Sequence, residues 1–316
     1  MTSNKREIAM VSRKALLIII CSLLFSPAGV QFVWAGKSVT VIITAGQSNT
    51  AGRCYNDSLP EYIKALGGQY KYCQWSYTNG RTRKADKEGV FRPFWPEMEG
   101  RGAGAGRFAY DAITYYLVEQ ALQQPFYVIK QAEGGTSIDP ACRSTNNHHW
   151  SADVAFLDST QSVNMGGLSL LKALESNIDK SIDALKAQGL DPDIKCMLWH
   201  QGESDRGKAA QYHDNLKAMV GHIRQHLVEK TGNRKYASLP FLCGAVPANS
   251  KQYKIQVEDA KMQLAKEDKN FHYIPLEEAT FIGDQLHFDR PTAERLGRDM
   301  FNKMLDLKLL KGKRAE

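Results

Sequence analysis

Ser48 occurs in this chain where a nucleophile would be expected. It lies in the sequence GQSN at 46–49, directly after an apolar, β-branched run at 39–44. A serine at the first turn of a helix lies among unpaired backbone N–H groups, which stabilise negative charge. This setting suits a nucleophile beside an oxyanion, but a serine that only caps the helix has the same local sequence. The other segments decide between these two interpretations.

Asp284 and His287 form a candidate pair of an acid and a base in the sequence GDQLHFD at 283–289. On a loop or a first helical turn, this spacing brings the carboxylate to one ring nitrogen. The contact fixes the tautomer and leaves the other nitrogen free to accept a proton. Surface and helix-capping groups share the same spacing, so the pair indicates catalysis only in combination with a nucleophile.

Two further polar clusters directly follow apolar runs. The run at 126–132 leads into EGGTS at 133–137, whose paired glycines let backbone N–H groups approach a ligand. The run at 194–199 leads into HQGESD at 200–205. Each cluster alone is typical of a turn or a helix-capping loop. In combination with the serine and the Asp-x-x-His pair, they supply a nucleophile, a base and oxyanion donors.

The elements that must position these clusters alternate between strands and helices. Strands are predicted at 39–44, 126–132, 194–199, 240–246 and 271–274, and helices at 108–122, 168–187, 212–228 and 257–264. Such alternation favours a parallel sheet covered on both faces, with ligands bound at the carboxyl ends of its strands. We predict one α/β domain, a three-layer α/β/α sandwich with a central, mainly parallel five-stranded sheet.

The segment at 53–106 is predicted to be irregular, because it is rich in glycine, proline, aromatic and charged residues. A loop of this length in a compact domain is usually functional, such as a lid or a wall of a binding site. Its aromatic residues include Tyr55, Tyr72, Trp75, Tyr77, Phe94 and Trp95. They pack either on a sugar or another flat ligand, or on one another as a small core of the loop.

Composition is typical of a soluble globular protein, with 316 residues and a formal net charge of +7. The residues before 36 carry four basic side chains against one acidic side chain, and a further basic run follows residue 307. We interpret that C-terminal run as a solvated tail and predict no nucleic-acid partner.

Residues 1–35 have the pattern of a secretory signal peptide. A basic start precedes an apolar run at 15–25 that is too short to span a bilayer comfortably, and small residues precede Gly36. Cleavage after Ala35 would leave one domain at 36–316, secreted or periplasmic and without stable membrane association. The alternative is a membrane anchor formed by the uncleaved signal.

Five cysteines follow the predicted signal, so at least one thiol stays unpaired. Cys196 and Cys243 lie in apolar strands and are predicted as small core residues. Cys54, Cys73 and Cys142 lie in loop-like sequence, where export would permit one disulfide. Which pair would form it is left open.

These ordered motifs resemble the sialate O-acetylesterase and acetylxylan esterase branch of the SGNH hydrolases. The resemblance extends from about residue 39 to about residue 305, and the HQGESD block is its most specific part. It implies that Ser48 is the nucleophile, His287 the general base and Asp284 its orienting acid. Glu203 is the alternative acid.

The same resemblance implies an oxyanion hole and a supporting shell. The donors would be the backbone N–H of Ser48, a backbone N–H of the glycine pair, assigned to Gly135, and the side-chain amide of Gln201. The supporting residues would be Gln47, Asn49, Gly134, Glu203 and Asp205.

By this resemblance the protein is an exported carbohydrate O-acetylesterase, which removes acetyl groups from an acetylated glycan through an acetyl-serine intermediate. Such a mechanism needs no metal or organic cofactor. Adjacent histidines cannot share the spacing of a preorganised ligand pair, so His148 and His149 are interpreted as loop or substrate-wall residues.

Other functions remain as alternatives. One is an esterase for aryl or phenolic esters, and another is a glycan-binding module without turnover. A flavodoxin-like nucleotide binder is disfavoured, because the glycine pair lacks the phosphate-loop spacing with its lysine. The acetylated sugar and the oligomeric state stay open.

Overall fold

A computed structural model describes residues 36–67, 69–78, 87–96 and 106–315. The predicted signal at 1–35 lies outside the described residues, so its function and its cleavage after Ala35 stay predictions. The division of the chain into a signal and a single domain is likewise still a prediction.

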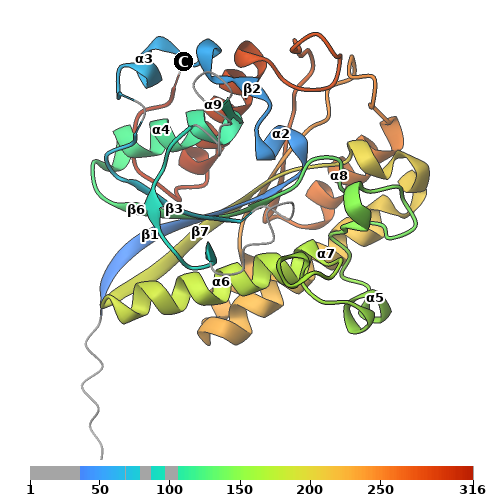
Figure 1. The fold of residues 1–316 in the computed structure, drawn as a ribbon, viewed down its shortest axis with the longest axis horizontal. Helices are drawn as coiled ribbons and strands as arrows, with labels where there is room; N and C mark the ends of the chain where they lie inside the picture. The colour runs from blue at the N-terminus through green and yellow to red at the C-terminus, as the bar shows by residue number, and fades with distance from the viewer. Residues whose placement is uncertain (1–35, 68, 79–86, 97–105, 316) are drawn as a thin grey trace, which may run out of the picture. The chain divides into compact units, whose positions relative to one another are not determined.

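A mainly parallel sheet forms the centre of the described structure (Figure 1). The strands are β1 (Lys37–Gly46), β2 (Cys54–Tyr55), β3 (Cys73–Thr78), β4 (Arg92–Pro93), β5 (Arg107–Phe108), β6 (Phe126–Ala132), β7 (Leu190–His200), β8 (Phe241–Gly244) and β9 (Phe271–Ile274). Among the described residues, seven strands form one sheet in the order β4-β3-β6-β1-β7-β8-β9. Edge strand β4 pairs antiparallel with β3, and all the other pairs of this sheet are parallel.

Strand β1 is buried on both faces of this sheet. Its side chains alternate, so that Val41, Ile43 and Ala45 pack in one apolar cluster and Ile42 packs in the other. A strand buried on both faces needs a nearly continuous apolar run, which explains the composition of this segment.

Helices cover both faces of the sheet (Figure 1). They are α2 (Ser48–Ala51), α3 (Glu61–Lys64), α4 (Tyr110–Leu122), α5 (Val154–Ser159), α6 (Leu170–Ala187), α7 (Tyr212–Thr231), α8 (Ile255–Glu267) and α9 (Arg290–Asp306). Helices α6, α7 and α8 pack on one face, and α3, α4 and α9 pack on the other. This arrangement confirms the predicted three-layer α/β/α fold class. The predicted number of five strands is wrong, because β3 and β4, from the segment predicted to be irregular, extend the sheet to seven strands among the described residues. Among the described helices, none is both long and apolar enough to span a bilayer.

Strand β3 corrects the prediction that the segment at 53–106 is irregular. It pairs in parallel with β6, and the rings of Trp75 and Tyr77 stack within the core at 5.0 Å. The strand was not predicted because it contains polar side chains. Their hydrogen-bond partners are distant in sequence, so the local pattern did not show that they could be buried. Ser76 Oγ, for example, lies 2.7 Å from Oδ1 of Asn177 on α6. Phe94 is also buried, so the core interpretation is correct for these three aromatic residues.

All five described cysteines are buried, unpaired thiols. Cys196 and Cys243 lie in the core, as predicted. No disulfide joins Cys54, Cys73 or Cys142, so the suggested loop bridge is wrong for the described residues. Instead, Sγ of Cys54 donates to the carbonyl oxygen of Phe288 at 3.0 Å.

The carboxyl ends of three strands reach the same level of the sheet. Gly46 of β1 lies opposite Ala132 of β6 on one side and His200 of β7 on the other. Gly46 has φ +147°, and a side chain there would collide with the carbonyl oxygen of His200. Glycine therefore permits the turn that leads from β1 to Ser48.

The core contains a buried ion pair, and we expect the removal of either partner alone to be costly. Lys130 Nζ of β6 lies 2.6 Å from Asp111 Oδ2 of α4, and both side chains are 1% exposed. The variant Asp111→Leu should lower the free energy of unfolding by about 3–5 kcal/mol, because it leaves a buried charge without its partner. Urea denaturation measures this loss.

Two further variants control this experiment. The double variant Asp111→Leu/Lys130→Met should recover most of the loss, because it removes both buried charges. Glu61→Ala breaks the exposed pair with Lys64, and it should cost less than about 1 kcal/mol. Equal losses of unfolding free energy in Asp111→Leu and Glu61→Ala would contradict the expectation that burial makes an unpaired charge costly.

Candidate active site

The turn after β1 places Ser48 at the carboxyl edge of the sheet. The N–H of Gln47 donates to the carbonyl oxygen of His200 at 3.1 Å, which ties this turn to the end of β7. Helix α2 begins at Ser48, with Gln47 at the N-cap position and no side-chain cap bond. The interpretation of Ser48 as a helix cap is therefore wrong.

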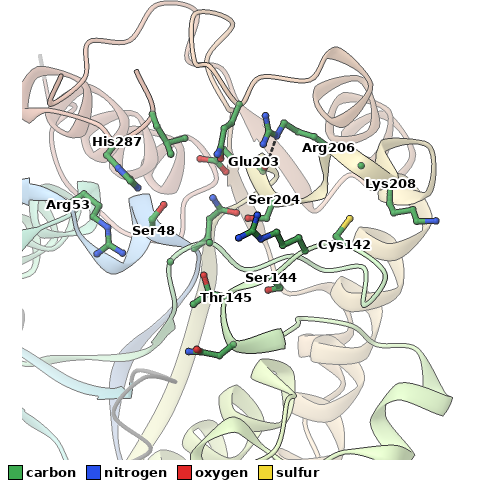
Figure 2. Close-up of a pocket in the computed structure, with 18 of the residues that line it drawn as sticks. Ser48, Arg53, Cys142, Ser144, Thr145, Glu203, Ser204, Arg206, Lys208 and His287 are labelled. Atoms are coloured by element: carbon green, nitrogen blue, oxygen red, sulfur yellow. Dashed lines mark hydrogen bonds between the residues drawn. The ribbon is translucent and has the colours of Figure 1, made fainter. Parts of the chain in front are cut away.

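Ser48 and His287 line one cavity of about 780 Å³. Figure 2 shows the imidazole of His287 next to the hydroxyl of Ser48. Ser48 is 4% exposed and lines the cavity, and its hydroxyl makes no hydrogen bond within the described residues, so it is accessible from the cavity. Among the described residues, no hydrogen bond joins these two side chains; catalytic hydrogen bonds often form only when the substrate is bound.

Asp284 holds the imidazole of His287 from the other side. Oδ2 of Asp284 lies 2.5 Å from Nδ1 of His287. Oδ1 accepts the N–H groups of Leu286 at 3.0 Å and of His287 at 2.8 Å. Burial raises the pKa of Asp284, but the N–H and the ring of His287 outweigh burial and hold this pKa below its ordinary value. The carboxylate is therefore ionised and occupies Nδ1 of the imidazole. Nε2 is the ring nitrogen that remains available to accept a proton.

The glycine pair after β6 lies beside Ser48. A methyl group at Gly134 would lie 3.1 Å from Cβ of Ser48, so glycine permits this close approach. Gly135 also lines the cavity, and its φ is +73°. Among the described residues, the N–H groups of Ser48 and Gly135 have no hydrogen-bond partner. Both are therefore available to a ligand oxygen.

Glu133 anchors the loop that follows the glycine pair. Its two carboxylate oxygens contact Nδ1 of His148 at 2.7 Å and Nδ2 of Asn146 at 3.2 Å. Nδ1 of His149 instead lies 2.9 Å from Oγ of Ser137. The two neighbouring histidines thus have separate partners. Within the described residues, no group of three or more His, Cys, Asp or Glu side chains is arranged to hold a metal ion.

Gln201 is positioned differently from the predicted oxyanion donor. Its Nε2 donates to the carbonyl oxygen of Thr136 at 3.1 Å and to a carboxylate oxygen of Asp205, while its Oε1 accepts from the hydroxyl of Tyr212 at 3.0 Å. Gln201 is fully buried and does not line the cavity. Both N–H groups of the amide are thus engaged, and a contact with a substrate oxyanion would require these bonds to break.

Asp205 connects the loop after β7 to the loop after β6. Its carboxylate accepts the N–H groups of Ile138 and Asp139 at 2.9–3.1 Å, in addition to the amide of Gln201. Burial raises the pKa of Asp205 to about 6, although these N–H donors oppose the increase. Asp205, predicted as a supporting residue, is thus fully buried and does not line the cavity.

Glu203 and Asn49 form a second buried connection. Oε1 of Glu203 lies 3.2 Å from Nδ2 of Asn49 and 3.2 Å from Nε2 of His200. Burial raises the pKa of Glu203, but His200 and the ammonium of Lys261 outweigh burial and lower it to about 2. No hydrogen bond or ion pair within the described residues joins Glu203 to the His287 ring, whereas Asp284 contacts that ring directly.

The cavity is lined by cationic side chains that the sequence analysis did not assign. They are Arg53, Arg143, Arg206 and Lys208. Figure 2 shows Arg206 and Lys208 on the side of the cavity away from Ser48 and His287. A signal was available in the sequence, because Arg206 and Lys208 closely follow the HQGESD cluster.

The sugar platform, one of the two alternatives for the aromatic residues, is absent from the described lining of this cavity. None of the Phe, Tyr or Trp side chains in the described residues lines it. The interpretation of the aromatic residues at 53–106 as a sugar platform is therefore not supported, and Trp75, Tyr77 and Phe94 are core residues instead.

Comparison with known proteins identifies a family and a fold. Residues 38–306 match the family described as carbohydrate esterase, sialic acid-specific acetylesterase. A solved structure of a protein from Arabidopsis thaliana is 18% identical, with 84% of this chain and 98% of that chain covered and a TM-score of 0.60. The structure of NanS is 13% identical, with 86% and 98% covered and a TM-score of 0.57. Curated protein sequences give no match. The likeness to these two solved structures, at 18% and 13% identity, shows the fold alone.

Asp205 should make stability depend on pH. Its pKa of about 6 in the folded state exceeds the ordinary value of 3.8, so the folded protein holds this proton more tightly than the unfolded chain. The free energy of unfolding should therefore fall as the pH rises from about 4 to about 6, by on the order of 3 kcal/mol at about 1.4 kcal/mol per pKa unit. Asp205→Asn lacks this ionisation.

Urea denaturation of wild type and Asp205→Asn across this pH interval measures the effect. The stability advantage of the wild type should shrink as the pH rises. A difference that stays constant from pH 4 to 7, read with both proteins folded, would show that Asp205 does not titrate in this way.

Proposed function

The chain belongs to the sialic acid-specific acetylesterase family of carbohydrate esterases, and we propose that it is a serine esterase that removes O-acetyl groups from a glycan. The observation that carries this proposal is the convergence of Ser48 and the Asp284–His287 pair on one cavity. An accessible hydroxyl beside an oriented imidazole is the arrangement of an activated serine nucleophile.

In the proposed mechanism, His287 removes the proton from Ser48, and the resulting alkoxide attacks the acetyl carbonyl carbon. Asp284 keeps Nδ1 of the imidazole protonated, so that Nε2 is the base. The imidazolium then protonates the sugar oxygen as the C–O bond to the acetyl group breaks. Water, deprotonated by the same imidazole, next attacks the acetyl-serine and releases acetate.

The negative charge on the tetrahedral intermediate needs hydrogen-bond donors. We assign this role to the backbone N–H groups of Ser48 and Gly135, which have no hydrogen-bond partner within the described residues. Gln201, which the sequence resemblance implied as the third donor, would instead support Gly135 indirectly through its bond to Thr136.

The charge of the cavity favours an acidic sugar as the carrier of the acetyl group. Arg143, Arg206 and Lys208 are exposed at the cavity. Among the described lining residues, Glu203 is the only carboxylate, and one of its oxygens is already engaged by His200 and Asn49. A cavity with this charge attracts a carboxylate-bearing sugar more strongly than a neutral aryl ester.

We further propose that residues 1–35 direct export and that cleavage follows Ala35. The support is the basic start, the apolar run and the small residues before Gly36. N-terminal sequencing of the mature protein tests this, and an intact Met1 on exported protein would exclude the cleavage.

Replacing Ser48 tests the proposed nucleophile. Ser48→Ala should lower kcat for acetate release by at least about 1000-fold, because no acetyl-enzyme can form. Acetate released from an acetylated sugar is measured directly. Ser38→Ala, at the exposed start of the same strand, is the matched control and should keep wild-type activity. An unchanged rate in Ser48→Ala would exclude the mechanism, and glycan binding without acetate release by the wild type would support a binding module instead.

Removing cationic charge tests the proposed class of substrate. The double variant Arg143→Gln/Lys208→Gln should raise KM for an O-acetylated sialic acid roughly fivefold to tenfold, since each exposed charge contact contributes up to about 1 kcal/mol. KM for a neutral aryl acetate should not change. Lys311→Gln in the exposed C-terminal segment controls for net charge. Equal effects on the charged and the neutral ester would contradict an acidic substrate.

A further inference from the structure

The side chain of Asn49 connects the segment of Ser48 to that of His287. Nδ2 of Asn49 donates to the carbonyl oxygen of Leu286 at 3.3 Å, and Oδ1 accepts the N–H of Phe288 at 3.1 Å. These two main-chain groups lie on either side of His287. Asn49 is 3% exposed and follows Ser48 directly, so one buried carboxamide links the hydroxyl-bearing residue to the imidazole-bearing loop.

The partners of this carboxamide permit one orientation of the amide. The carbonyl oxygen of Leu286 and the carboxylate of Glu203 can only accept hydrogen bonds, whereas the N–H of Phe288 can only donate one. Nδ2 must therefore face the two acceptors and Oδ1 must face Phe288, as the structure has it. Neither an aspartate nor an aliphatic side chain at position 49 can make all three contacts.

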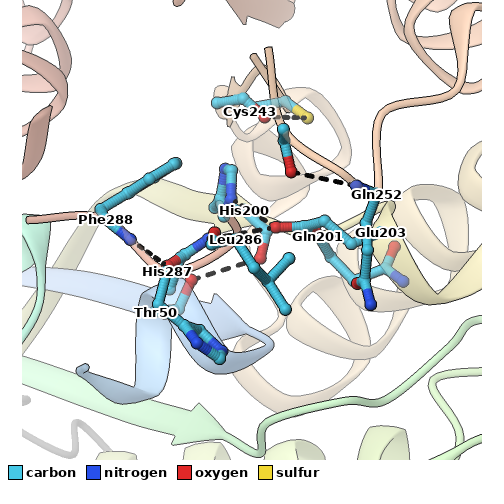
Figure 3. Close-up of polar contacts among 12 residues, drawn as sticks. Thr50, His200, Gln201, Glu203, Cys243, Gln252, Leu286, His287 and Phe288 are labelled. Atoms are coloured by element: carbon cyan, nitrogen blue, oxygen red, sulfur yellow. Dashed lines mark hydrogen bonds and ion pairs between the residues drawn. The ribbon is translucent and has the colours of Figure 1, made fainter. Parts of the chain in front are cut away.

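Glu203 also accepts a hydrogen bond from Nδ2 of this carboxamide. Its Oε1 contacts both Nδ2 of Asn49 and Nε2 of His200 at the end of β7. Glu203 is 1% exposed. Figure 3 shows Leu286 and Phe288 on either side of His287, close to Glu203 and His200. The loop of the imidazole is thus connected through the carboxamide to the central strands.

The other hydrogen bonds of this loop, among the described residues, go to residues outside α2. The N–H of Ile282 donates to the carbonyl oxygen of His287 within the loop at 3.0 Å. The N–H of Lys251 donates to the carbonyl oxygen of Gln285 at 2.9 Å, and Cys54 contacts Phe288. Within the described residues, the Asn49 carboxamide therefore supplies the hydrogen bonds that join this loop directly to α2.

We propose that Asn49 is a positioning residue, which sets the distance and angle between the imidazole of His287 and the hydroxyl of Ser48 by bonding to the main chain on both sides of the histidine. The inference rests on the proposed function, because it assigns Ser48 and His287 their parts in the reaction. A misplacement of reacting groups by about 1 Å can cost about 100-fold in rate. Loss of the carboxamide should therefore slow catalysis while leaving the binding cavity intact.

Three variants test this role. Asn49→Ala removes all three contacts, and Asn49→Asp places a carboxylate against that of Glu203. Asn49→Asp/Glu203→Gln reverses the direction of that hydrogen bond, with the new amide as donor. Asn56→Ala is the matched control, because Asn56 is 9% exposed and its amide has no hydrogen-bond partner within the described residues.

Each variant is assayed for kcat and KM, for labelling of Ser48 by a fluorophosphonate, and for hydrogen exchange of the Phe288 amide. Asn49→Ala and Asn49→Asp should lower kcat about 10- to 100-fold, with KM changed less than about twofold. Labelling of Ser48 should slow by a similar factor in both variants. Exchange at Phe288 should accelerate in Asn49→Ala, which removes the acceptor of this N–H. The double variant should recover at least part of the kcat lost in Asn49→Asp, and Asn56→Ala should match wild type.

Several results would overturn the inference. One is unchanged kcat and unchanged labelling in a folded Asn49→Ala. Another is unchanged exchange at Phe288, which reports the hydrogen bond whether or not the protein is an esterase. A third is a loss of kcat accounted for wholly by unfolded protein in thermal melts. If the wild type neither released acetate nor reacted with the fluorophosphonate, the proposed function would fail instead, and the exchange measurement would still decide whether Asn49 holds the loop.

Discussion

The parallel pairing of β1 with a neighbour on each side is the constraint on which the candidate site depends. Gly46 lies opposite both Ala132 and His200, so the chain leaves all three strands at one level of the sheet. Residues that follow these strands must meet there, although more than 150 positions separate 46 from 200. The apolar runs that form the strands thereby determine where the polar clusters are placed. This follows the general rule for ligand sites in open α/β sheets.

Buried carboxylates then determine how the loops at this edge are held. Glu133 binds the loop of His148, Asp205 binds the main chain after the glycine pair, and Glu203 binds Asn49. A buried carboxylate is costly unless hydrogen-bond donors surround it, and an unpaired one would be more costly still. Each acid therefore favours a single arrangement of the loop that supplies its donors. Several polar residues of the motifs thus hold the loops in place.

The accessible side of the cavity differs from this buried framework. Its described lining contains basic side chains from the loops after β6 and β7, and one carboxylate. The family match concerns ester hydrolysis on carbohydrates, and the likeness to solved structures at 13% and 18% identity concerns the fold. The choice of sugar therefore has to be argued from this lining. The charge of the lining acts on a charged substrate over a longer distance than direct contacts do.

The sequence alone determined the features that depend on local pattern. Apolar runs located the strands at 126–132 and 271–274 at their observed bounds, and the spacing of Asp284 and His287 predicted their contact. Only the tertiary structure decided which distant groups meet. Strand β3 was missed because its polar side chains find partners on α6, and the amide of Gln201 faces Asp205 and Thr136 instead of the cavity. The thiols of Cys54, Cys73 and Cys142 are buried and unpaired. Hydrogen bonds between buried groups depend on which segments fold against each other, and a local pattern contains no information about that.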